Sequence, residues 1–389
     1  MPLALKAHYS RFLGARPDVL HFAAHSHHPW PDVTREAVVQ AWDDAARLVD
    51  HKWDHVLGAV LPAVQGHVAR VLGFSRPEQI AFAPNTHELV TRVITCFPPG
   101  RGLRVLTTDG EFMSFARQIA RLEESGDVQV TRVPTEPFET FDTRFHDAAA
   151  AGPWDLVYLS HVFFNSGFAV HDLAGIVGAV HEPNTIVMVD GYHGFLALPV
   201  RFEALEKRLF YVAGGYKYAQ SGEGACFMHV PAGCTLRPRY TGWFASFGRL
   251  TDHTLDRVEY ADDGFRFWGA TFDPTGLYRL RAVLDWLSGL GLSVADIHAH
   301  VQELQRMFLA MLSRLDLRAL PAASLMTPRD LSRQGHFLTF RVPRAMELAQ
   351  KLRSLGVEVD SRADRLRFGF GLYHEPADVE RLGERLRKL

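Results

Sequence analysis

The feature that most constrains the fold is a series of short apolar runs that alternate with amphipathic segments. Runs of this length are typical of buried strands, and strands recurring between helices predict a mostly parallel sheet with helices on both faces. Ligands of such sheets bind at the C-terminal ends of the strands. The seven runs are QIAFA at 79–83, LRVLT at 103–107, DVQVTRV at 127–133, DLVYLS at 155–160, TIVMVD at 185–190, LFYVAG from 209 and ACFMHV at 225–230.

Helical periodicity precedes and follows these runs. Residues 32–73 show amphipathic patterning that ends at Gly73, and two more helices are expected at 276–290 and 294–315, before a strand, a helix, a strand and a last helix. The aromatic, Gly-rich stretch 231–275 is expected to form long loops. The predicted divisions are an N-terminal segment packing with the small domain, a large domain and a small α+β domain, at 1–50, 51–270 and 271–389.

Composition favours small-molecule chemistry. The 389 residues carry a formal net charge of -2, which gives no field that would favour nucleic acid or anionic lipid. The sequence contains no run of about 18 apolar residues, the length that a membrane-spanning helix needs. The three cysteines match neither a disulfide framework nor a zinc site, so we expect a cytoplasmic enzyme of reducing surroundings.

The segment AGGYKYAQSGEGACFMHV at 213–230 carries the strongest local signal. An apolar strand runs into a turn centred on Lys217, and a second strand begins after Gly224. Aromatic and glycine neighbours exclude water from the amine and lower its pKa, which a lysine that forms Schiff bases requires. The alternative for this segment alone is a solvated turn lysine.

Asp190 ends the apolar run TIVMVD upstream of Lys217. A carboxylate is costly to bury at a strand end unless it meets a cation. The pyridinium nitrogen of pyridoxal 5'-phosphate is such a cation, and a neighbouring Asp keeps it protonated. The alternative is that Asp190 caps the following turn.

A candidate phosphate site follows the first apolar run. Thr86 and His87 stand where helical periodicity begins, and backbone N–H groups at a helix start bind phosphate. The same letters also form an ordinary helix cap with Thr86 and Glu88.

In this order, the phosphate turn, an aromatic residue after a strand, the strand-end Asp and the lysine resemble the class V aminotransferase family of fold-type I pyridoxal phosphate enzymes. Within that family the details look most like kynureninases, over nearly the whole chain. The likeness implies a large domain with a mostly parallel seven-stranded sheet and a smaller α+β C-terminal domain. It is carried further by LHFAAHSHHPWP at 20–31, GGYKY at 214–218, TGWF at 241–244, FRF at 265–267 and LRFGFGLYHEPADV at 366–379.

The resemblance also implies roles for single residues. The implied catalytic residues are Lys217, Asp190 and Tyr216. The implied cofactor-binding residues are Thr86, His87, Phe112, Asp190, His193, Tyr216, Lys217, Trp243 and Thr271. Arg367 is expected to hold the substrate carboxylate, and His25 or Ser26 to touch the substrate.

The implied activity is that of a pyridoxal phosphate enzyme acting on an α-amino acid through an external aldimine and removal of the Cα proton. A kynureninase-like reaction would then hydrolyse the Cβ–Cγ bond, whereas an aminotransferase would pass the amino group to a keto acid. The resemblance further implies a homodimer with shared active sites, in which Trp243 and Thr271 act on the cofactor of the other chain.

The sequence departs from the family pattern at several positions, and these departures leave other functions open. Where kynureninases continue after FRF with an Asn-Pro-Pro run, this chain has Trp268-Gly269-Ala270-Thr271, which puts kynurenine specificity in doubt. No cysteine follows Cys234, which argues against a cysteine desulfurase. A noncatalytic protein of this fold is a second alternative. A metal hydrolase is a weaker one, because no nearby carboxylate or cysteine completes a site with the histidines of 25–28.

Overall fold

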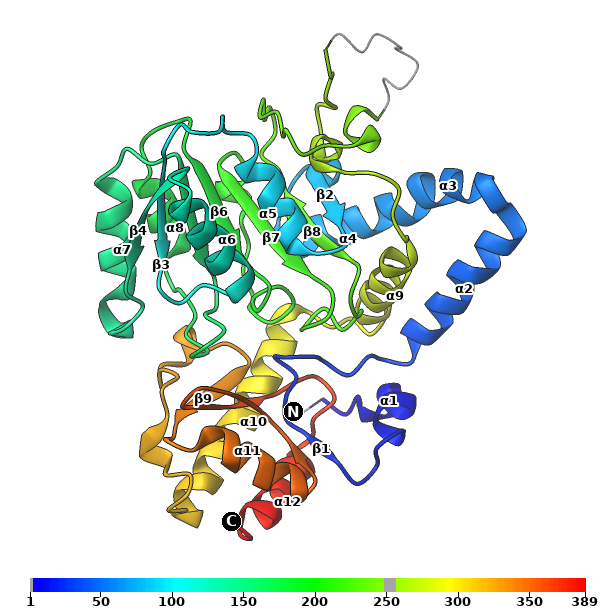
Figure 1. Ribbon diagram of the computed structural model, residues 1–389. Helices are drawn as coiled ribbons and strands as arrows, with labels where there is room; N and C mark the ends of the chain where they lie inside the picture. The colour runs from blue at the N-terminus through cyan, green and yellow to red at the C-terminus, as the bar shows by residue number, and fades with distance from the viewer. Residues whose placement is uncertain (1–2, 248–256) are drawn as a thin grey trace.

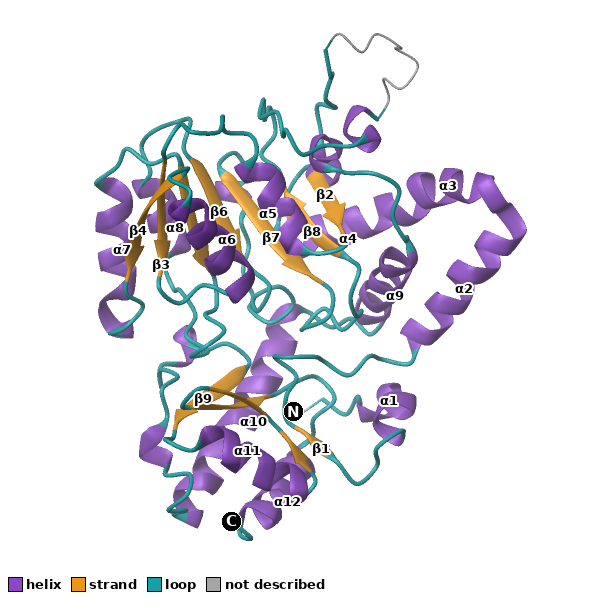
Figure 2. Ribbon diagram, viewed as in Figure 1, coloured by secondary structure: helices purple, strands orange, loops and turns teal. Residues whose placement is uncertain are grey.

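The computed structural model describes residues 3–247 and 257–389, and it shows a large sheet domain above a smaller α+β domain (Figure 1). Figure 2 shows the strands of the large domain gathered in one twisted sheet, with helices packed around it. Residues 248–256, part of the loop region expected at 231–275, lie outside the described residues.

The large sheet has seven strands in the order β2-β8-β7-β6-β5-β3-β4. Only β8 runs against its neighbours, so the predicted mostly parallel sheet of seven strands is confirmed. The central strands are buried along their whole length, which explains why they appear in the sequence as continuous apolar runs. The strands are β2 (Ile80–Ala83), β3 (Leu103–Thr108), β4 (Val128–Val133), β5 (Leu156–Ser160), β6 (Ile186–Asp190), β7 (Leu209–Gly214) and β8 (Cys226–His229).

Helices cover this sheet, and α5 and α6 cross in front of it in the view of Figure 1. The helical stretch expected at 32–73 forms α2, which packs against α9, then a short α3, a π-helical turn and α4, which ends at the left-handed Gly73. The helices of the large domain are α2 (Val33–Leu48), α3 (Lys52–His55), α4 (Leu61–Leu72), α5 (Thr86–Ile94), α6 (Met113–Glu124), α7 (Phe141–Ala150), α8 (Leu173–Ala179) and α9 (Thr275–Gly289).

The small domain is built on a three-stranded antiparallel sheet in the order β11-β12-β9. The N-terminal segment joins it, because β1 pairs in parallel with β10 and Ala23 forms a bridge with Gly369. The elements are α1 (Ser10–Gly14), β1 (Leu20–His21), α10 (Val294–Leu315), β9 (Phe337–Arg341), α11 (Ala345–Ser354), β10 (Val357–Glu358), β11 (Asp360–Arg362), β12 (Arg365–Gly369) and α12 (Pro376–Leu386).

The two largest hydrophobic clusters correspond to the two domains, one formed by the large sheet with the helices around it and one between β9, β12 and helices α10 to α12. The division into 1–50, 51–270 and 271–389 stays a prediction. None of the helices in the described parts of the chain is long and apolar enough to cross a membrane.

Candidate active site

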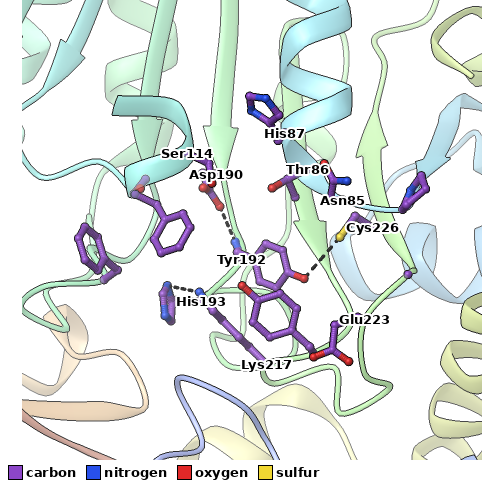
Figure 3. A pocket seen from close by; sticks show the side chains of 16 residues that line it. Asn85, Thr86, His87, Ser114, Asp190, Tyr192, His193, Lys217, Glu223 and Cys226 are labelled. Atoms are coloured by element: carbon purple, nitrogen blue, oxygen red, sulfur yellow. Dashed lines mark hydrogen bonds between the residues drawn. The ribbon is translucent and has the colours of Figure 1, made fainter. Parts of the chain in front are cut away.

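A cavity of about 420 Å³ opens at the C-terminal ends of the parallel strands (Figure 3). Strands β5, β6 and β7 run parallel, so their last residues meet at one edge of the sheet, where ligands of such folds bind. Seven of the predicted site residues line this cavity: Thr86, His87, Phe112, Asp190, His193, Tyr216 and Lys217.

Lys217 lies in the turn after β7 with its amine in an aromatic cage, and only 5% of the residue is exposed. Its Nζ lies 4.8 Å from the ring centre of Tyr192, 5.3 Å from that of Phe112 and 3.5 Å from His193 Nδ1. Burial lowers the pKa of Lys217 to about 7 against the opposing effect of Asp190. A large fraction of the amine is therefore neutral, and nucleophilic, at physiological pH.

Asp190 is the last residue of β6, and its carboxyl group is held by two donors. The backbone N–H of Tyr192 donates to Oδ1 at 2.9 Å and the Tyr158 hydroxyl donates to Oδ2 at 3.2 Å. Burial nevertheless raises the pKa of Asp190. Since no cation among the described residues forms an ion pair with it, Asp190 is suited to a cationic ligand group in the cavity.

A second buried carboxyl group, which the sequence did not single out, lies beside Asp190. Glu111 accepts hydrogen bonds from the hydroxyls of Thr108 and Ser160 at 2.7 and 2.6 Å, and burial raises its pKa to about 8. Ser160 lines the cavity opposite Asp190 in the sheet register. The two carboxyls thus have different surroundings, one open to the cavity and one enclosed by hydroxyls.

The candidate phosphate site lies at the first turn of α5. Asn85 is the N-cap, since its side chain accepts from the Glu88 N–H at 2.9 Å. The expected alternative, a cap made by Thr86, is therefore wrong, and the hydroxyl of Thr86 is left at the cavity wall with His87 beside it. A hydroxyl and the positive end of the helix dipole together fit a phosphate group.

The predicted substrate residues lie behind the cavity wall. Arg367 is 3% exposed, pairs with Asp360, and donates to the Phe164 carbonyl. The His25 ring stacks on Phe337 at 4.6 Å and comes within 3.6 Å of Asp360. Neither residue, nor Ser26, lines the cavity in this single chain.

Trp243 and Thr271, predicted to act across a dimer, contact each other on the surface instead of lining the cavity of their own chain. The indole N–H of Trp243 lies 3.3 Å from the Thr271 hydroxyl, and the ring, 48% exposed, stacks on Phe244 at 4.0 Å. The structure thus brings this pair together apart from the other residues predicted to bind the cofactor.

Several lining residues were missed by sequence reasoning, among them Tyr192, Phe164, Glu223 and Cys226. Tyr192 follows Asp190 by two positions, so the strand-end signal that identified the carboxylate could also have identified it. Cys226 begins β8, where it pairs with Gly214 in the sheet, and contacts the Tyr192 hydroxyl at 3.4 Å, a tertiary contact that no local pattern predicts.

These residues fit pyridoxal 5'-phosphate. The cavity offers a helix start for a phosphate, an unpaired carboxyl group for a ring nitrogen, aromatic rings for the ring face and one neutralised amine for an aldehyde. In the described parts of the chain no group of three or more metal-ligating side chains is gathered that could hold a metal ion.

Comparison with known proteins gives a family match over most of the chain. The family model described as aminotransferase class-V matches residues 42–382. A kynureninase of Pseudomonas fluorescens is 28% identical over 221 residues, which are 55% of this chain and 51% of the relative. A probable cysteine desulfurase of Vibrio cholerae is 25% identical over 58% of this chain and 56% of the relative. The match thus spans little more than half the length of these relatives.

Solved structures share the fold. A cysteine desulfurase of Thermococcus onnurineus NA1 without ligand superposes with a TM-score of 0.79 at 19% identity, over 96% of this chain and 94% of that one. The cystine C-S lyase C-DES, solved with its reaction product cysteine persulfide, gives a TM-score of 0.81 at 19% identity, over 97% and 100% of the two chains. At such identities the likeness shows the fold alone.

Proposed function

This chain belongs to the class V aminotransferase family, and from that premise we propose that it is a pyridoxal 5'-phosphate enzyme that deprotonates the Cα of an α-amino acid. The observation that carries the proposal is the buried amine of Lys217, which shares one cavity with the strand-end carboxyl of Asp190. Burying an amine and a carboxyl group is costly, and a ligand bound between them would offset that cost.

The residues that line the cavity have different roles in this reaction. Pyridoxal phosphate supplies, when bound, an electron sink for the substrate Cα. Asp190 holds a proton at the ring nitrogen, and Thr86 and the start of α5 hold the phosphate. The amine of Lys217 removes the Cα proton, because a base with a pKa near the working pH transfers protons most effectively. His193, within 3.5 Å of the amine, orients it, and Tyr216 is placed to relay a proton.

For the reaction outcome we propose a kynureninase-like cleavage of the bond beyond Cβ, supported by the match to the Pseudomonas enzyme. Transfer of the amino group to a keto acid is the second candidate, favoured by the run Trp268-Gly269-Ala270-Thr271 in place of Asn-Pro-Pro. Trp268, which stands where kynureninases have that Asn, is buried in the core, so this position does not supply a polar group to the site.

A desulfurase reaction is supported by the cysteine desulfurases among the relatives, but the cavity lacks a reactive thiol for it. Of the three cysteines, only Cys226 lines it, and burial raises the pKa of that thiol to about 11. A thiol that keeps its proton is a poor acceptor of sulfur. The chain has no cysteine after Cys234 to take that role.

The test of the proposed function combines a spectrum with a product assay. Purified protein mixed with pyridoxal phosphate is expected to gain a visible absorption band that borohydride shifts and fixes covalently, and Lys217→Ala is expected to abolish it. A panel of L-amino acids, followed for keto acids and for cleavage products, then separates the two outcomes. An unchanged band in Lys217→Ala, or a protein that gains no band, would contradict the proposal.

Three finer features are part of the same proposal. Arg367, with His25 and Ser26 nearby, is the substrate side of the site, supported by the buried Nε of Arg367, which has no hydrogen-bond partner. The enzyme acts as a homodimer whose Trp243 and Thr271 reach the partner's site, and it works in the cytoplasm.

A further inference from the structure

The wall between the cavity and the small domain contains a second arginine, Arg362, beside the predicted substrate residue Arg367. Arg362 ends β11 and is exposed, while Arg367 in the neighbouring strand is buried. Both guanidinium groups lie 5.9 Å from the ring centre of Phe164, which lines the cavity. Two cations therefore flank one aromatic side chain of the cavity wall.

The two arginines differ in their counter-ions. Arg367 forms an ion pair with Asp360, its direct partner in the register between β11 and β12. Arg362 contacts Met113 Sδ at 3.9 Å and the Phe164 ring, and no carboxylate of the described residues pairs with it. The Arg367–Asp360 pair is neutral as a unit, so the net positive charge of this wall resides on Arg362.

The backbone holds Arg362 in place. It precedes a two-residue turn, Ala363-Asp364, in which Ala363 has a φ of 50°, as tight hairpins require at their first central residue. The Val342 N–H donates to the Asp364 carbonyl at 2.7 Å and ties this turn to β9. Asp360 and Arg362 are two positions apart on one strand and so project from the same face.

From this charge balance we propose that Arg362 is a substrate-binding residue, which supplies the attraction for the α-carboxylate that the neutral Arg367–Asp360 pair cannot supply alone. The inference rests on the proposed function, since it concerns the amino acid substrate of that site. A carboxylate that approaches the Arg367–Asp360 pair meets no net charge without Arg362, and one unit of positive charge with it. Arg367 then orients the carboxylate through its Nε, which has no hydrogen-bond partner, and Arg362 supplies the net positive charge that attracts it.

The test compares two ligands that differ only in the carboxylate, L-phenylalanine and 2-phenylethylamine, by calorimetric Kd on protein loaded with pyridoxal phosphate. Arg362→Gln is expected to weaken L-phenylalanine about ten-fold and to leave the amine within about two-fold. The control is Arg344→Gln, which makes the same charge change at an exposed residue paired with Glu347, and neither ligand should be affected.

Charge restoration distinguishes this role from a structural one. In Asp360→Asn/Arg362→Gln the net charge of the wall returns to one positive unit, now on Arg367, so L-phenylalanine affinity should recover to within about three-fold of the wild type. Should this double variant fail to fold, Arg362→Lys decides, because it keeps the charge at an exposed site and should retain most of the affinity.

Several results would overturn the inference. Equal weakening of both ligands by Arg362→Gln would make Arg362 structural, and no weakening of L-phenylalanine would leave it without a role in binding. A wild type that binds L-phenylalanine no better than the amine would have no carboxylate site at this wall. A protein that gains no visible band with pyridoxal phosphate fails earlier, at the proposed function, and the two failures are thereby distinguished.

Discussion

Burial prepares Lys217 for its chemistry more than any single neighbour does. Loss of water is the largest cause of its lowered pKa, and the guanidinium groups of Arg367 and Arg362 act in the same direction, against Asp190. The preceding turn is tight because Gly214 ends β7 where a Cβ would lie 2.5 Å from the Tyr192 hydroxyl. Glycine at this position lets the chain pass under Tyr192 and bring the lysine into the cavity.

The rate at which pyridoxal phosphate attaches covalently should therefore follow the neutral fraction of Lys217. With a pKa of about 7, the rate is expected to rise as pH increases through about 7 and to level off above 8, whereas an exposed lysine would still be rising at pH 10. Stopped-flow absorption between pH 5.5 and 9 measures this midpoint.

A matched variant tests the cause of that midpoint. Asp190→Asn removes the charge that raises the pKa of Lys217, so the midpoint should move to lower pH while weaker cofactor binding shows separately in the amplitude. A midpoint above pH 9 in the wild type would mean that the amine is hydrated, and the burial argument would be wrong.

At the residue scale, some features of the site could be predicted from the sequence and others could not. Lys217 and Asp190 could be predicted because Asp190 ends an apolar strand, Lys217 lies in the turn just after another, and parallel strands end at one edge. The ion pair between Arg367 and Asp360 could not, because it depends on the register of a hairpin whose first strand, β11, is three residues long and only partly buried.

At the scale of elements, the central strands of the large sheet were predictable because both of their faces are buried and the apolar runs are uninterrupted. The short strands β1, β10 and β11 carried no such pattern. Their pairing follows from tertiary contacts between the N-terminal segment and the small domain, which local sequence does not record.

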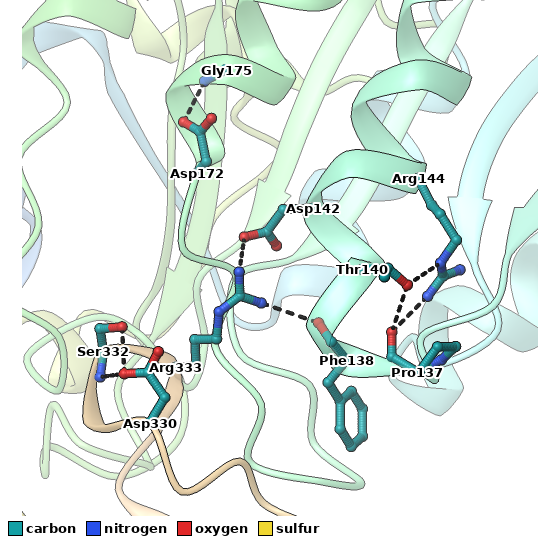
Figure 4. A network of polar contacts seen from close by, with 10 residues as sticks. All are labelled: Pro137, Phe138, Thr140, Asp142, Arg144, Asp172, Gly175, Asp330, Ser332 and Arg333. Atoms are coloured by element: carbon teal, nitrogen blue, oxygen red, sulfur yellow. Dashed lines mark hydrogen bonds and ion pairs between the residues drawn. The ribbon is translucent and has the colours of Figure 1, made fainter.

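One polar network ties the small domain's segment 330–333 to helix α7 (Figure 4). Arg333 donates to the Phe138 carbonyl at 3.1 Å and pairs with Asp142 at 3.0 Å, and both side chains are largely buried. Burial raises the pKa of Asp142 even beside this guanidinium. Removing the arginine would leave a largely buried carboxylate without its counter-ion.

Arg333→Ala is accordingly expected to lower the free energy of unfolding by about 2–4 kcal/mol, somewhat less than for a fully buried ion pair, because the two side chains are 20% and 13% exposed. The control is Arg306→Ala, which removes an exposed pair with Glu303 and should cost less than about 1 kcal/mol. Urea denaturation followed by circular dichroism measures both. Equal effects of the two substitutions would show that the network in Figure 4 does not hold the elements together.

On the scale of the whole molecule, two of the predicted cofactor-binding residues lie outside the cavity of the single chain. Trp243 and Thr271 contact each other outside the cavity, on a loop region with further exposed aromatic side chains such as Tyr240. Exposed aromatic side chains are costly in water and typical of protein interfaces. A symmetric partner that covers this region would bring the same residues to its own cavity and receive them in return.

The last prediction follows from that reciprocity. Lys217→Ala and Trp243→Ala should each be inactive as homodimers, but a mixed dimer holds one site with both wild-type residues, because the Lys217 of one chain meets the Trp243 of the other. After subunit exchange in an equimolar mixture, half of the dimers are mixed and each has one intact site, so about a quarter of wild-type Cα-proton exchange should return. NMR of the amino acid in deuterated water measures that exchange.

The matched control pairs Lys217→Ala with Asp190→Ala, two residues that line the cavity of the same chain. Every site in that mixed dimer lacks one of them, so no activity should return, and any recovery there would expose contamination or refolding in place of complementation. Sedimentation at the working concentration shows whether dimers form and exchange. Confirmed exchange without recovery in the Lys217→Ala and Trp243→Ala mixture, or a protein that sediments as a monomer, would mean that each chain completes its own site and that Trp243 serves only local packing.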